Sequence, residues 1–394
     1  MREHASFLVM LGAAFCMFAI NVIGKNNLSP EAYSQMAMDL IFLGYLGTLS
    51  FLGADSVFIR KSKVDAVGKI QCSRELFVSM GVSCIAAWVV FPILGVSFID
   101  LGGASISSVW KYILLSFLVP FFMIVSTMLR LCGDFIAAQI ILNLWKPIFL
   151  CALLYCVLFN EIQSEIGGLI IAALFIGAVV ACGLFYKRVD IEVDRCSDSL
   201  KGMFQLQYSY LLSFVFFAAL GSVDRVVLSG SVEPAQFAEY IYMVVILVFP
   251  INMISNYFGY KELVRVKQGY VLEAFEKSTK LIPLALCLYL VYSLLIYFLK
   301  DLIGLELNFY VWVSALVIVV CKMPYSMFSA IMGGVGNSTD INNANYISLI
   351  SLAIGALLIY LLADLQYSLL VVAGLWIIRV FLYYEKSKKY IVNR

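Results

Sequence analysis

Residues 7–24 read FLVMLGAAFCMFAINVIG and form one of about twelve apolar stretches of similar length in this 394-residue chain. A membrane-spanning helix needs about 20 mostly apolar residues to cross a hydrocarbon core of roughly 30 Å. Hydrophobic residues make up 63% of the chain, charged residues only 13%, and the mean hydropathy is +0.96. A water-soluble protein of this composition would expose more apolar surface than water tolerates. The sequence therefore predicts an all-α polytopic membrane protein, whose backbone polar groups are satisfied by helical hydrogen bonds.

Twelve membrane-spanning helices are expected from the apolar pattern. They fall at about 5–23, 32–57, 76–99, 108–130, 136–158, 165–186, 205–229, 234–258, 279–299, 309–334, 343–363 and 366–384. The first stretch is long for a signal-peptide core and lacks an A-x-A-like cleavage site, so we interpret it as a retained helix that also targets the chain. Three glycines within spans, Gly44, Gly47 and Gly177, are interpreted as points of close helix packing.

Lys and Arg residues are distributed unevenly between the two sides of the predicted bundle. With the N-terminus in the cytoplasm, twenty of the 27 lie on the inner side, three (Lys25, Lys111 and Lys300) on the outer side and four within spans. The positive-inside rule therefore predicts that both termini are cytoplasmic and that the number of spans is even. The net charge of +2 does not indicate nucleic-acid binding, because the basic residues face lipid headgroups.

Cysteine and histidine residues give no sign of a metal site. Ten cysteines are scattered singly with no C-x-x-C pair, and the one histidine, His4, lies outside the bundle. Metal clusters and disulfide frameworks use closely spaced ligands of these two types. The sequence therefore predicts no metal, no cofactor and no disulfide framework, and the cysteines are interpreted as small apolar packing residues.

The chain carries a repeat at an offset of about 204 residues. Pro30 begins one helix in LSPEAYSQMAMDLIF, and Pro234 begins another in SVEPAQFAEYIYMVV. Pro120 and Pro324 lie inside spans at the same offset of 204. Gly133 and Gly336 follow at an offset of 203. These matches, together with the matching loops and charge runs, indicate a duplicated unit.

Two parallel six-helix halves follow from this duplication, because an even number of helices gives both halves the same orientation. We expect an N-terminal lobe at 1–190, a cytoplasmic linker at 191–204 and a C-terminal lobe at 205–394. Such lobes are related by an axis along the membrane normal, so a central cavity and a substrate path are expected where they meet.

The hairpin GSVDRVVLSGSVEPAQFAEYIYMVVILVFP, residues 221–250, resembles the polysaccharide-transporter branch of the MOP flippase superfamily, which includes Wzx-like O-antigen and capsule flippases. Members of that branch tend to carry an acid–base pair near the end of the seventh helix, then a short turn and an aromatic-rich start to the eighth. Here these features are Asp224 and Arg225, then Pro234, Phe237 and Tyr240.

This resemblance implies two lobes in a V-shaped bundle, alternating access and a place in the bacterial cytoplasmic (inner) membrane. The implied substrate is an undecaprenyl-pyrophosphate-linked oligosaccharide, moved from the cytoplasmic to the periplasmic leaflet for O-antigen, lipopolysaccharide or capsule synthesis. The implied partners are this substrate, membrane lipids and other polysaccharide-assembly membrane proteins. The sequence leaves open which glycan is carried and which ion drives the cycle.

Four cations, Lys146, Arg225, Lys322 and Arg379, lie within predicted spans. Each costs about 2.5–3.5 kcal/mol at a helix centre on insertion scales. A hydrated cavity that receives an anion explains this cost, and the pyrophosphate of the implied substrate is such an anion. The alternative is an interhelical ion pair for each cation. For Arg379 a further alternative is a side chain that reaches the nearby cytoplasmic surface.

Asp39 and Asp224 are the acidic candidates within spans. Asp39 is either a coupling residue for H⁺ or Na⁺, or the ion-pair partner of a cation. Asp224 projects about 100° around the helix from its neighbour Arg225 and so has the opportunity to pair elsewhere. Four polar residues near the start of the seventh span either contact sugar hydroxyls or lie at the membrane interface: Gln205, Gln207, Tyr208 and Tyr210.

A multidrug or metabolite exporter of the same superfamily is the alternative function. Such exporters commonly centre on acidic residues that attract organic cations, whereas the mid-span charges of Lys146 and Lys322 are positive. A major-facilitator transporter is disfavoured, because GADSVFIRKSKVDAVGK (residues 53–69) lacks the G-x-x-x-D-R-x-G-R-[RK] pattern. A membrane polymerase, ligase or glycosyltransferase usually has a large external loop, whereas the external segments here have only about ten residues. We therefore do not expect an enzyme.

Overall fold

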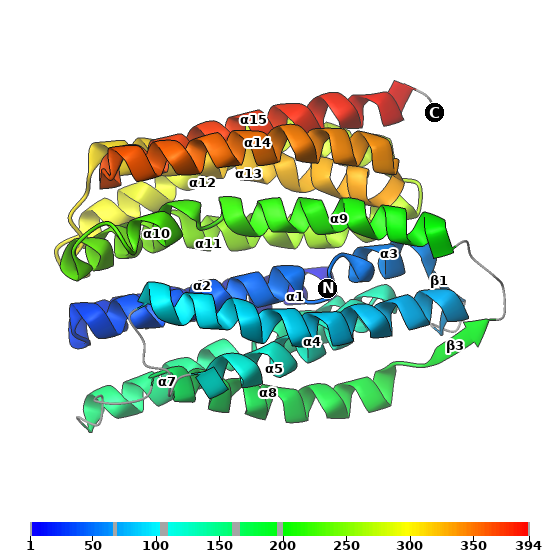
Figure 1. Cartoon of the computed structure of the whole chain (residues 1–394), viewed down its shortest axis with the longest axis horizontal. Coiled ribbons are helices and arrows are strands. Elements are labelled where there is room, and N and C mark those ends of the chain that lie inside the picture. The colour runs from blue at the N-terminus through cyan, green and yellow to red at the C-terminus, as the bar shows by residue number, and fades with distance from the viewer. Residues whose placement is uncertain (1, 66–68, 103–108, 160–165, 195–199, 393–394) are drawn as a thin grey trace. The chain divides into compact units, whose positions relative to one another are not determined.

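The structure is a computed structural model that describes residues 2–65, 69–102, 109–159, 166–194 and 200–392 (Figure 1). Cys196 and residues 195–199 of the expected linker lie outside the described residues. The elements in chain order are α1(Arg2–Asn27), α2(Pro30–Leu49), α3(Ala54–Lys61), β1(Lys63–Val64), β2(Ile70–Ser73), α4(Arg74–Gly102), α5(Val109–Leu131), α6(Phe135–Asn143), α7(Trp145–Leu158), α8(Ile166–Arg188), β3(Ile191–Asp194), α9(Leu200–Leu220), α10(Val223–Leu228), α11(Pro234–Lys267), α12(Val271–Leu299), α13(Phe309–Val335), α14(Ser338–Leu362) and α15(Leu365–Val392).

Within the described residues, eleven segments are long and apolar enough to cross a membrane, and α2 together with α3 makes a twelfth. The span at 135–158 consists of two helices, α6 and α7. Helix α11 extends well beyond the end expected at residue 258. The predicted polytopic all-α membrane protein with about twelve spans is confirmed.

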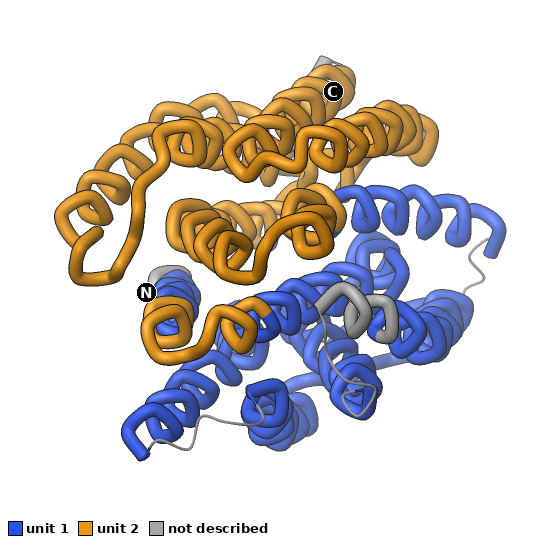
Figure 2. Tube along the Cα trace, turned by 60° about the vertical axis from the view of Figure 1, so that its left-hand side comes forward, with its two compact units in different colours: residues 1–20, 35–218 blue, residues 21–34, 219–394 orange. Residues whose placement is uncertain are grey.

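The chain divides into two compact units, shown in Figure 2. Unit 1 comprises residues 1–20 and 35–218, and unit 2 comprises residues 21–34 and 219–394. These bounds differ from the expected lobes at two places, because α9 packs within unit 1 and the hairpin between α1 and α2 packs within unit 2.

Polar contacts hold α9 within unit 1. The Gln207 side chain donates to the Ser83 hydroxyl at 2.7 Å and accepts from the Ser79 hydroxyl at 3.1 Å. The Arg60 guanidinium donates to the Tyr210 hydroxyl at 3.2 Å. Gln207 and Tyr210 therefore tie α9 to α3 and α4. The expected span at 205–229 is not one helix, because α9 ends at Leu220 and the chain enters unit 2 through the short α10.

The hairpin at residues 21–34 is held within unit 2 by contacts of three kinds. Lys25 forms an ion pair with Glu239 of α11. The Tyr33 hydroxyl donates to the Asn21 side chain at 3.1 Å, which closes the hairpin on itself. The ring of Tyr33 packs edge-on against Tyr242 of α11, with centroids 6.2 Å apart.

Each unit is built around one central helix, and the two central helices are related by the predicted repeat. In unit 1, α5 packs against α4, α6 and α8; in unit 2, α13 packs against α11, α12 and α15. Buried residues make up 61% of the apolar window of α5 and 67% of that of α13. Pro120 lies inside α5 and Pro324 inside α13, so the offset read from the sequence relates the helices that organise the two cores.

The helix that follows each central helix also begins in the same way. Asp134 caps α6 by accepting from the amide of Ala137 at 3.1 Å, and Asn337 caps α14 by accepting from the amide of Asp340 at 2.7 Å. The preceding glycines do not share a conformation, since φ is +79° at Gly133 but −63° at Gly336. The repeated element is therefore the Asx cap and not the glycine.

A sharp break separates α2 from α3, where the sequence predicts one continuous helix over 32–57. Leu52 and Gly53 have φ values of 50° and 86°, and the two helices are bent by 40°. A Cβ on Gly53 would lie 2.7 Å from the Gln207 carbonyl oxygen and 2.8 Å from the Leu211 amide nitrogen. The left-handed backbone and the close approach of α9 both require glycine at this position.

A small sheet lies at one end of α4 and α8 in unit 1 and is absent from the sequence-based expectations (Figure 1). The strand order is β1-β2-β3, with β1 antiparallel and β3 parallel to β2. The side chains of Ile70 and Cys72 on β2 are buried. The sheet therefore joins the loop after α3 to the loop after α8.

The three glycines interpreted as packing points divide into two groups. A Cβ on Gly177 would lie 3.0 Å from the ring of Phe122, so close packing is confirmed there. Within the described part of the chain, a Cβ on Gly44 or Gly47 would meet no atom within 4 Å, so the interpretation is wrong for these two.

Gly53→Ala should lower the unfolding free energy of the purified protein by about 2 kcal/mol or more, because alanine is strained at positive φ and its Cβ meets the α9 backbone. Gly44→Ala is the matched control, since it adds the same methyl group to an open helical position and should be neutral or stabilising by about 0.5–1 kcal/mol. Thermal unfolding in detergent measures both effects. Equal unfolding midpoints for the two variants would contradict this account of the break.

Candidate functional site

Arg379 of α15 is completely buried, with 0% of its surface exposed. Its guanidinium donates to the hydroxyls of Tyr383 at 2.8 Å, Ser348 at 3.0 Å and Tyr325 at 3.3 Å. The ring centroid of Tyr383 lies 4.0 Å from the guanidinium carbon, which adds a cation–π contact. The side chain therefore points into the interior of unit 2, and the alternative that it reaches the cytoplasmic surface is wrong.

Lys322 of α13 is joined to Arg379 through aromatic rings. Its ammonium nitrogen lies 4.8 Å from the ring centroid of Trp376, one turn before Arg379 on α15. Trp376 packs edge-on against Tyr325, with centroids 5.4 Å apart, and Tyr325 accepts the hydrogen bond from Arg379. We call Tyr325, Trp376 and Tyr383 the aromatic cluster. Lys322 thus lies over Trp376, and Arg379 lies over Tyr325 and Tyr383, within one connected set of rings.

Asp224 and Arg225 form the third part of the site in unit 2. Asp224 is 1% exposed and accepts from the Tyr240 hydroxyl of α11 at 2.6 Å. Its other oxygen lies 3.7 Å from the Nε atom of Arg225. Arg225 also donates to the carbonyl oxygen of Gly221, and among the described residues its buried Nε has no hydrogen-bond partner. Asp224 therefore does have a partner on another helix, as its helical position predicts, while it remains close to Arg225.

Helix packing within unit 2 brings these residues together. α13 packs against α15, α15 against α14, and the short α10 against both α14 and α15. As a result, the charges of Asp224 and Arg225 lie within electrostatic range of Lys322. We call Asp224, Arg225, Lys322 and Arg379 the cationic cluster. It contains three basic side chains and one acid within the hydrophobic unit.

Lys146 lies in unit 1, where the span 135–158 is interrupted. Pro147 has no N–H, so the carbonyl of Asn143, four residues earlier, loses its helical donor and α6 ends at Asn143. Lys146 is 8% exposed. Its ammonium donates to the side-chain oxygen of Asn143 at 2.7 Å. The Asn143 amide donates in turn to the Gln139 side chain at 3.0 Å. Pro147 thus lies beside a row of buried polar side chains, Gln139, Asn143 and Lys146.

Asp39 also lies in unit 1, on α2, and is 7% exposed. Its carboxylate accepts from the Tyr112 hydroxyl at 2.9 Å and from the Gln35 amide at 3.1 Å. It is also within electrostatic range of Lys111. Asp39 therefore belongs to a polar group on α2 and α5 that is separate from the cationic cluster of unit 2.

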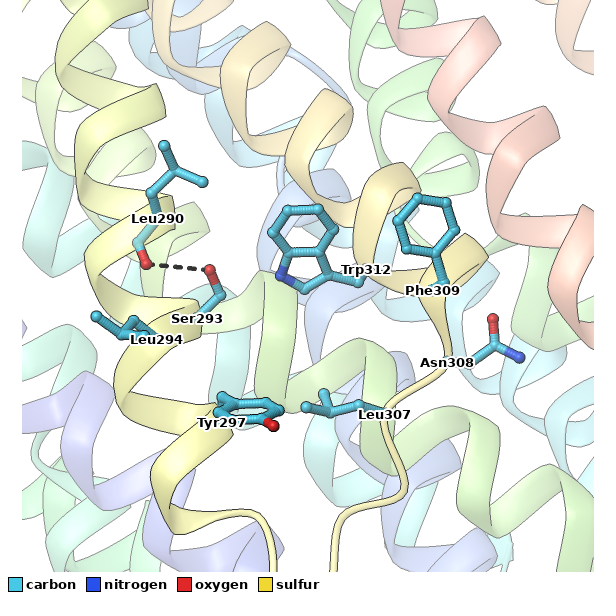
Figure 3. A pocket seen from close by; sticks show the side chains of 8 residues that line it. All are labelled: Leu290, Ser293, Leu294, Tyr297, Leu307, Asn308, Phe309 and Trp312. Carbon is cyan, nitrogen blue, oxygen red and sulfur yellow. Dashed lines mark hydrogen bonds between the residues drawn. The ribbon is translucent and has the colours of Figure 1, made fainter.

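A pocket of about 440 Å³ opens between the end of α12 and the start of α13 (Figure 3). Its walls include Leu290, Leu294, Phe309 and Trp312 and are mainly apolar. None of the predicted site residues lines it. It is therefore a feature distinct from the cationic cluster.

The cationic side chains have partners that the sequence-based search did not name, but their spacing carries a signal. Trp376 and Tyr383 stand three residues before and four residues after Arg379, and Tyr325 stands three after Lys322. Residues three or four apart share one face of a helix. A search for aromatic residues at these distances from each buried cation would have found the aromatic cluster. Ser348, on another helix, has no such signal.

Metal ligands are not gathered anywhere in the described ranges. Within them, no group of three or more His, Cys, Asp and Glu side chains is arranged to hold a metal ion. The nine cysteines in the described ranges are free thiols.

No protein-family model and no curated protein sequence matches the chain. Solved structures do match it along nearly its whole length. A crystal structure of MATE in complex with Br-NRF has a TM-score of 0.65 and 16% identity, over 99% of this chain and 95% of that chain. An inward-facing multidrug resistance MATE family transporter of the MOP superfamily has a TM-score of 0.60 and 14% identity, over 100% and 99%. The outward-facing conformation of such a transporter gives 0.57 and 15%, over 98% and 94%.

These similarities define the fold of the chain as that of the MATE transporters of the MOP superfamily. The fold of these solved structures agrees with the fold that the resemblance in the sequence implies. The solved neighbours are MATE transporters, and none of the three is named as a polysaccharide flippase.

Replacement of Arg379 and of Lys322 should have different effects on stability. Arg379→Ala removes a fully buried side chain and three hydrogen bonds, so we expect a loss of about 2–5 kcal/mol. Lys322→Ala should change stability by less than about 1 kcal/mol, because removal of a partly buried cation also removes its desolvation cost.

Thermal unfolding in detergent measures this difference, with Arg379→Lys as an intermediate that keeps the charge but loses the planar fork of donors. An Arg379→Ala protein as stable as the parent would show that the hydrogen bonds to Tyr325, Ser348 and Tyr383 do not support unit 2.

Proposed function

We propose that this chain is an alternating-access transporter whose substrate is an anionic lipid-linked oligosaccharide, and that it is not an enzyme. The finer assignment is a flippase that moves an undecaprenyl-pyrophosphate-linked O-antigen or capsule repeat unit from the cytoplasmic to the periplasmic leaflet. The observation that carries it is the cationic cluster inside a membrane-spanning unit. Arg225 lies 3.7 Å from the Asp224 carboxylate, Lys322 lies over Trp376 and Arg379 is fully buried. A cation in a membrane-spanning segment is costly, and a cluster with three bases and one acid favours an anionic ligand.

The groups of the cluster have different proposed roles. Lys322 and Arg225 bind the phosphates, because an ammonium and a guanidinium are the usual partners of phosphate oxygens. Arg379, which already donates to three hydroxyls, positions the aromatic cluster against which Lys322 lies. Lys146 contributes a second cationic point in unit 1.

Asp224 and Asp39 are proposed as partners that adjust the local charge. Asp224 lies beside Arg225 and balances part of the cluster while it is empty. Asp39 is already held by Tyr112 and Gln35, which favours a structural role or a coupling role over direct contact with an anion.

The proposed location is the bacterial cytoplasmic membrane with both termini on the cytoplasmic side. The support is the distribution of Lys and Arg, most of which fall on the side of the termini. In this orientation the sheet formed by β1, β2 and β3 lies on the cytoplasmic side. Other membrane proteins of polysaccharide assembly are the proposed partners.

A multidrug or metabolite exporter is the second candidate, and one observation favours it directly. Two of the solved neighbours are named as multidrug resistance transporters, so the fold by itself supports the exporter better than the flippase. The fold is compatible with both functions, and the two differ in the charge of the substrate. A cluster with more bases than acids favours an anion over an organic cation.

Deletion of the gene in its native host separates the two candidates. A flippase deletion should accumulate complete lipid-linked repeat units on the inner leaflet and leave drug susceptibility unchanged. Mass spectrometry of extracted lipid-linked intermediates, with growth in the presence of cationic drugs, measures both properties. Normal intermediates with increased drug susceptibility would replace the flippase by the exporter.

Single substitutions test the cluster itself by complementation of that deletion. Lys322→Ala, Arg225→Ala and Lys146→Ala should each lower flipping about tenfold to a hundredfold, because a charge-assisted contact contributes about 1.5–3 kcal/mol. Lys280→Ala, which removes an exposed cation from α12, is the control and should complement fully. Immunoblots check that protein levels persist. Full complementation by all three variants would remove the cationic cluster from the binding site.

A further inference from the structure

The pocket between α12 and α13 is a groove with fixed, aromatic walls (Figure 3). The ring of Trp312 stacks on Phe309 with centroids 6.4 Å apart and contacts Tyr289 with centroids 6.0 Å apart. The Tyr289 hydroxyl donates to the carbonyl oxygen of Trp312 at 2.9 Å, which ties α12 to α13 at the base of the groove. The groove is therefore formed in advance of any occupant.

Two polar groups in the walls, the Ser293 hydroxyl and the Asn308 side-chain oxygen, form hydrogen bonds within the protein. The Ser293 hydroxyl donates to the carbonyl oxygens of Tyr289 at 2.7 Å and Leu290 at 3.2 Å. The side-chain oxygen of Asn308 accepts from the amides of Tyr310 and Val311 as the cap of α13. The rest of the lining is mainly apolar, whereas a water molecule in a protein cavity needs two to four polar partners. The groove thus favours an apolar occupant.

The groove faces outward from the wall of a membrane-spanning unit. Leu294 on one side of it is 57% exposed and Phe309 on the other is 70% exposed, and both lie in helices that are long and apolar enough to cross a membrane. Exposed apolar side chains on membrane-spanning helices contact lipid. The apolar ligand that we expect in the groove is therefore the acyl chain of a lipid.

Charges gather where α12 ends, beside the groove. Lys300 lies over the ring of Tyr297, a lining residue, with its ammonium nitrogen 5.0 Å from the centroid. The amide of Leu305 donates to the Lys300 carbonyl at 2.9 Å and closes the turn. Asp301 and Glu306 are exposed in the same connection. One base and two acids at this point are complementary to a headgroup that carries both a phosphate and an amine.

We propose that the α12–α13 groove is a binding site for one membrane phospholipid with an amine-bearing, zwitterionic headgroup. One acyl chain fills the groove between Leu294 and Phe309, the phosphate binds Lys300, and the amine lies toward Asp301 and Glu306. The chain gains no hydrophobic free energy, since it leaves hydrocarbon for hydrocarbon. Selectivity comes from contact with the rigid aromatic walls and from the headgroup charges. The site is independent of the transported substrate.

Native mass spectrometry of the full chain, purified in detergent and supplied with phosphatidylethanolamine or phosphatidylglycerol, tests the proposal. The parent protein should retain one phosphatidylethanolamine at detergent concentrations that strip phosphatidylglycerol. Ser293→Phe, which fills the groove, should lower retention at least about tenfold. Leu294→Trp fills the groove from an exposed position, so it keeps the test available if Ser293→Phe fails to fold. Lys300→Ala should remove the preference for phosphatidylethanolamine.

Matched controls exclude effects of bulk and charge alone. Val291→Phe adds the same ring to an exposed position of α12 that does not line the groove, and Lys187→Ala removes an exposed cation at the end of α8. Both controls should retain the lipid as the parent does. Equal retention by the filled and control variants would overturn the proposal, as would equal retention of the two lipids by the parent.

Discussion

The constraint on which this structure depends is that the bilayer offers no hydrogen-bond partner to a backbone N–H or C=O group. Wherever a proline interrupts a helix, the freed carbonyl must be satisfied by another part of the protein. Pro250 inside α11 leaves the carbonyl of Ile246 without a helical donor, and the hydroxyl of Tyr292 on α12 donates to it at 2.7 Å. The Tyr292 side chain thus satisfies the free carbonyl of α11 and at the same time holds α12 against α11.

The same constraint governs charged groups, which remain inside the units only where near neighbours stabilise them. Arg379 is surrounded by hydroxyls, Lys322 lies over a ring and Lys146 donates to an amide. At the ends of the helices, charged side chains form ion pairs, and each unit has such a pair at the start of the helix that follows its central helix. Asp134 at the start of α6 pairs with Arg188 at the end of α8, and Asp340 in the first turn of α14 pairs with Lys389 of α15. The cationic cluster is distinct from these pairs because its near contacts are largely neutral.

The sequence predicted the number of spans and the repeat because both rest on strong, local signals, but it did not predict the breaks within 32–57 and 205–229. Length and hydropathy define a span, and Pro120 and Pro324 mark equivalent central helices. The sheet was not predicted from the sequence, although VDIEVD, residues 189–194, alternates apolar and acidic residues with the period of a strand. That signal is short and lies beside long apolar helices. The charged members of the cationic cluster could be predicted from the sequence. Ser348 could not, because it lies on a different helix and has no fixed spacing to Arg379.

The sequence by itself determined that the chain spans a membrane about twelve times, where the cations lie along it and that its two halves are related. These properties depend on the free energy of moving each segment out of water, which is nearly additive over residues. Only the tertiary structure decided that α9 packs with unit 1, that Arg379 is enclosed by Tyr325, Ser348 and Tyr383, and that Asp224 and Arg225 approach Lys322. Those outcomes depend on which helix faces meet, and residues far apart in the chain decide this together.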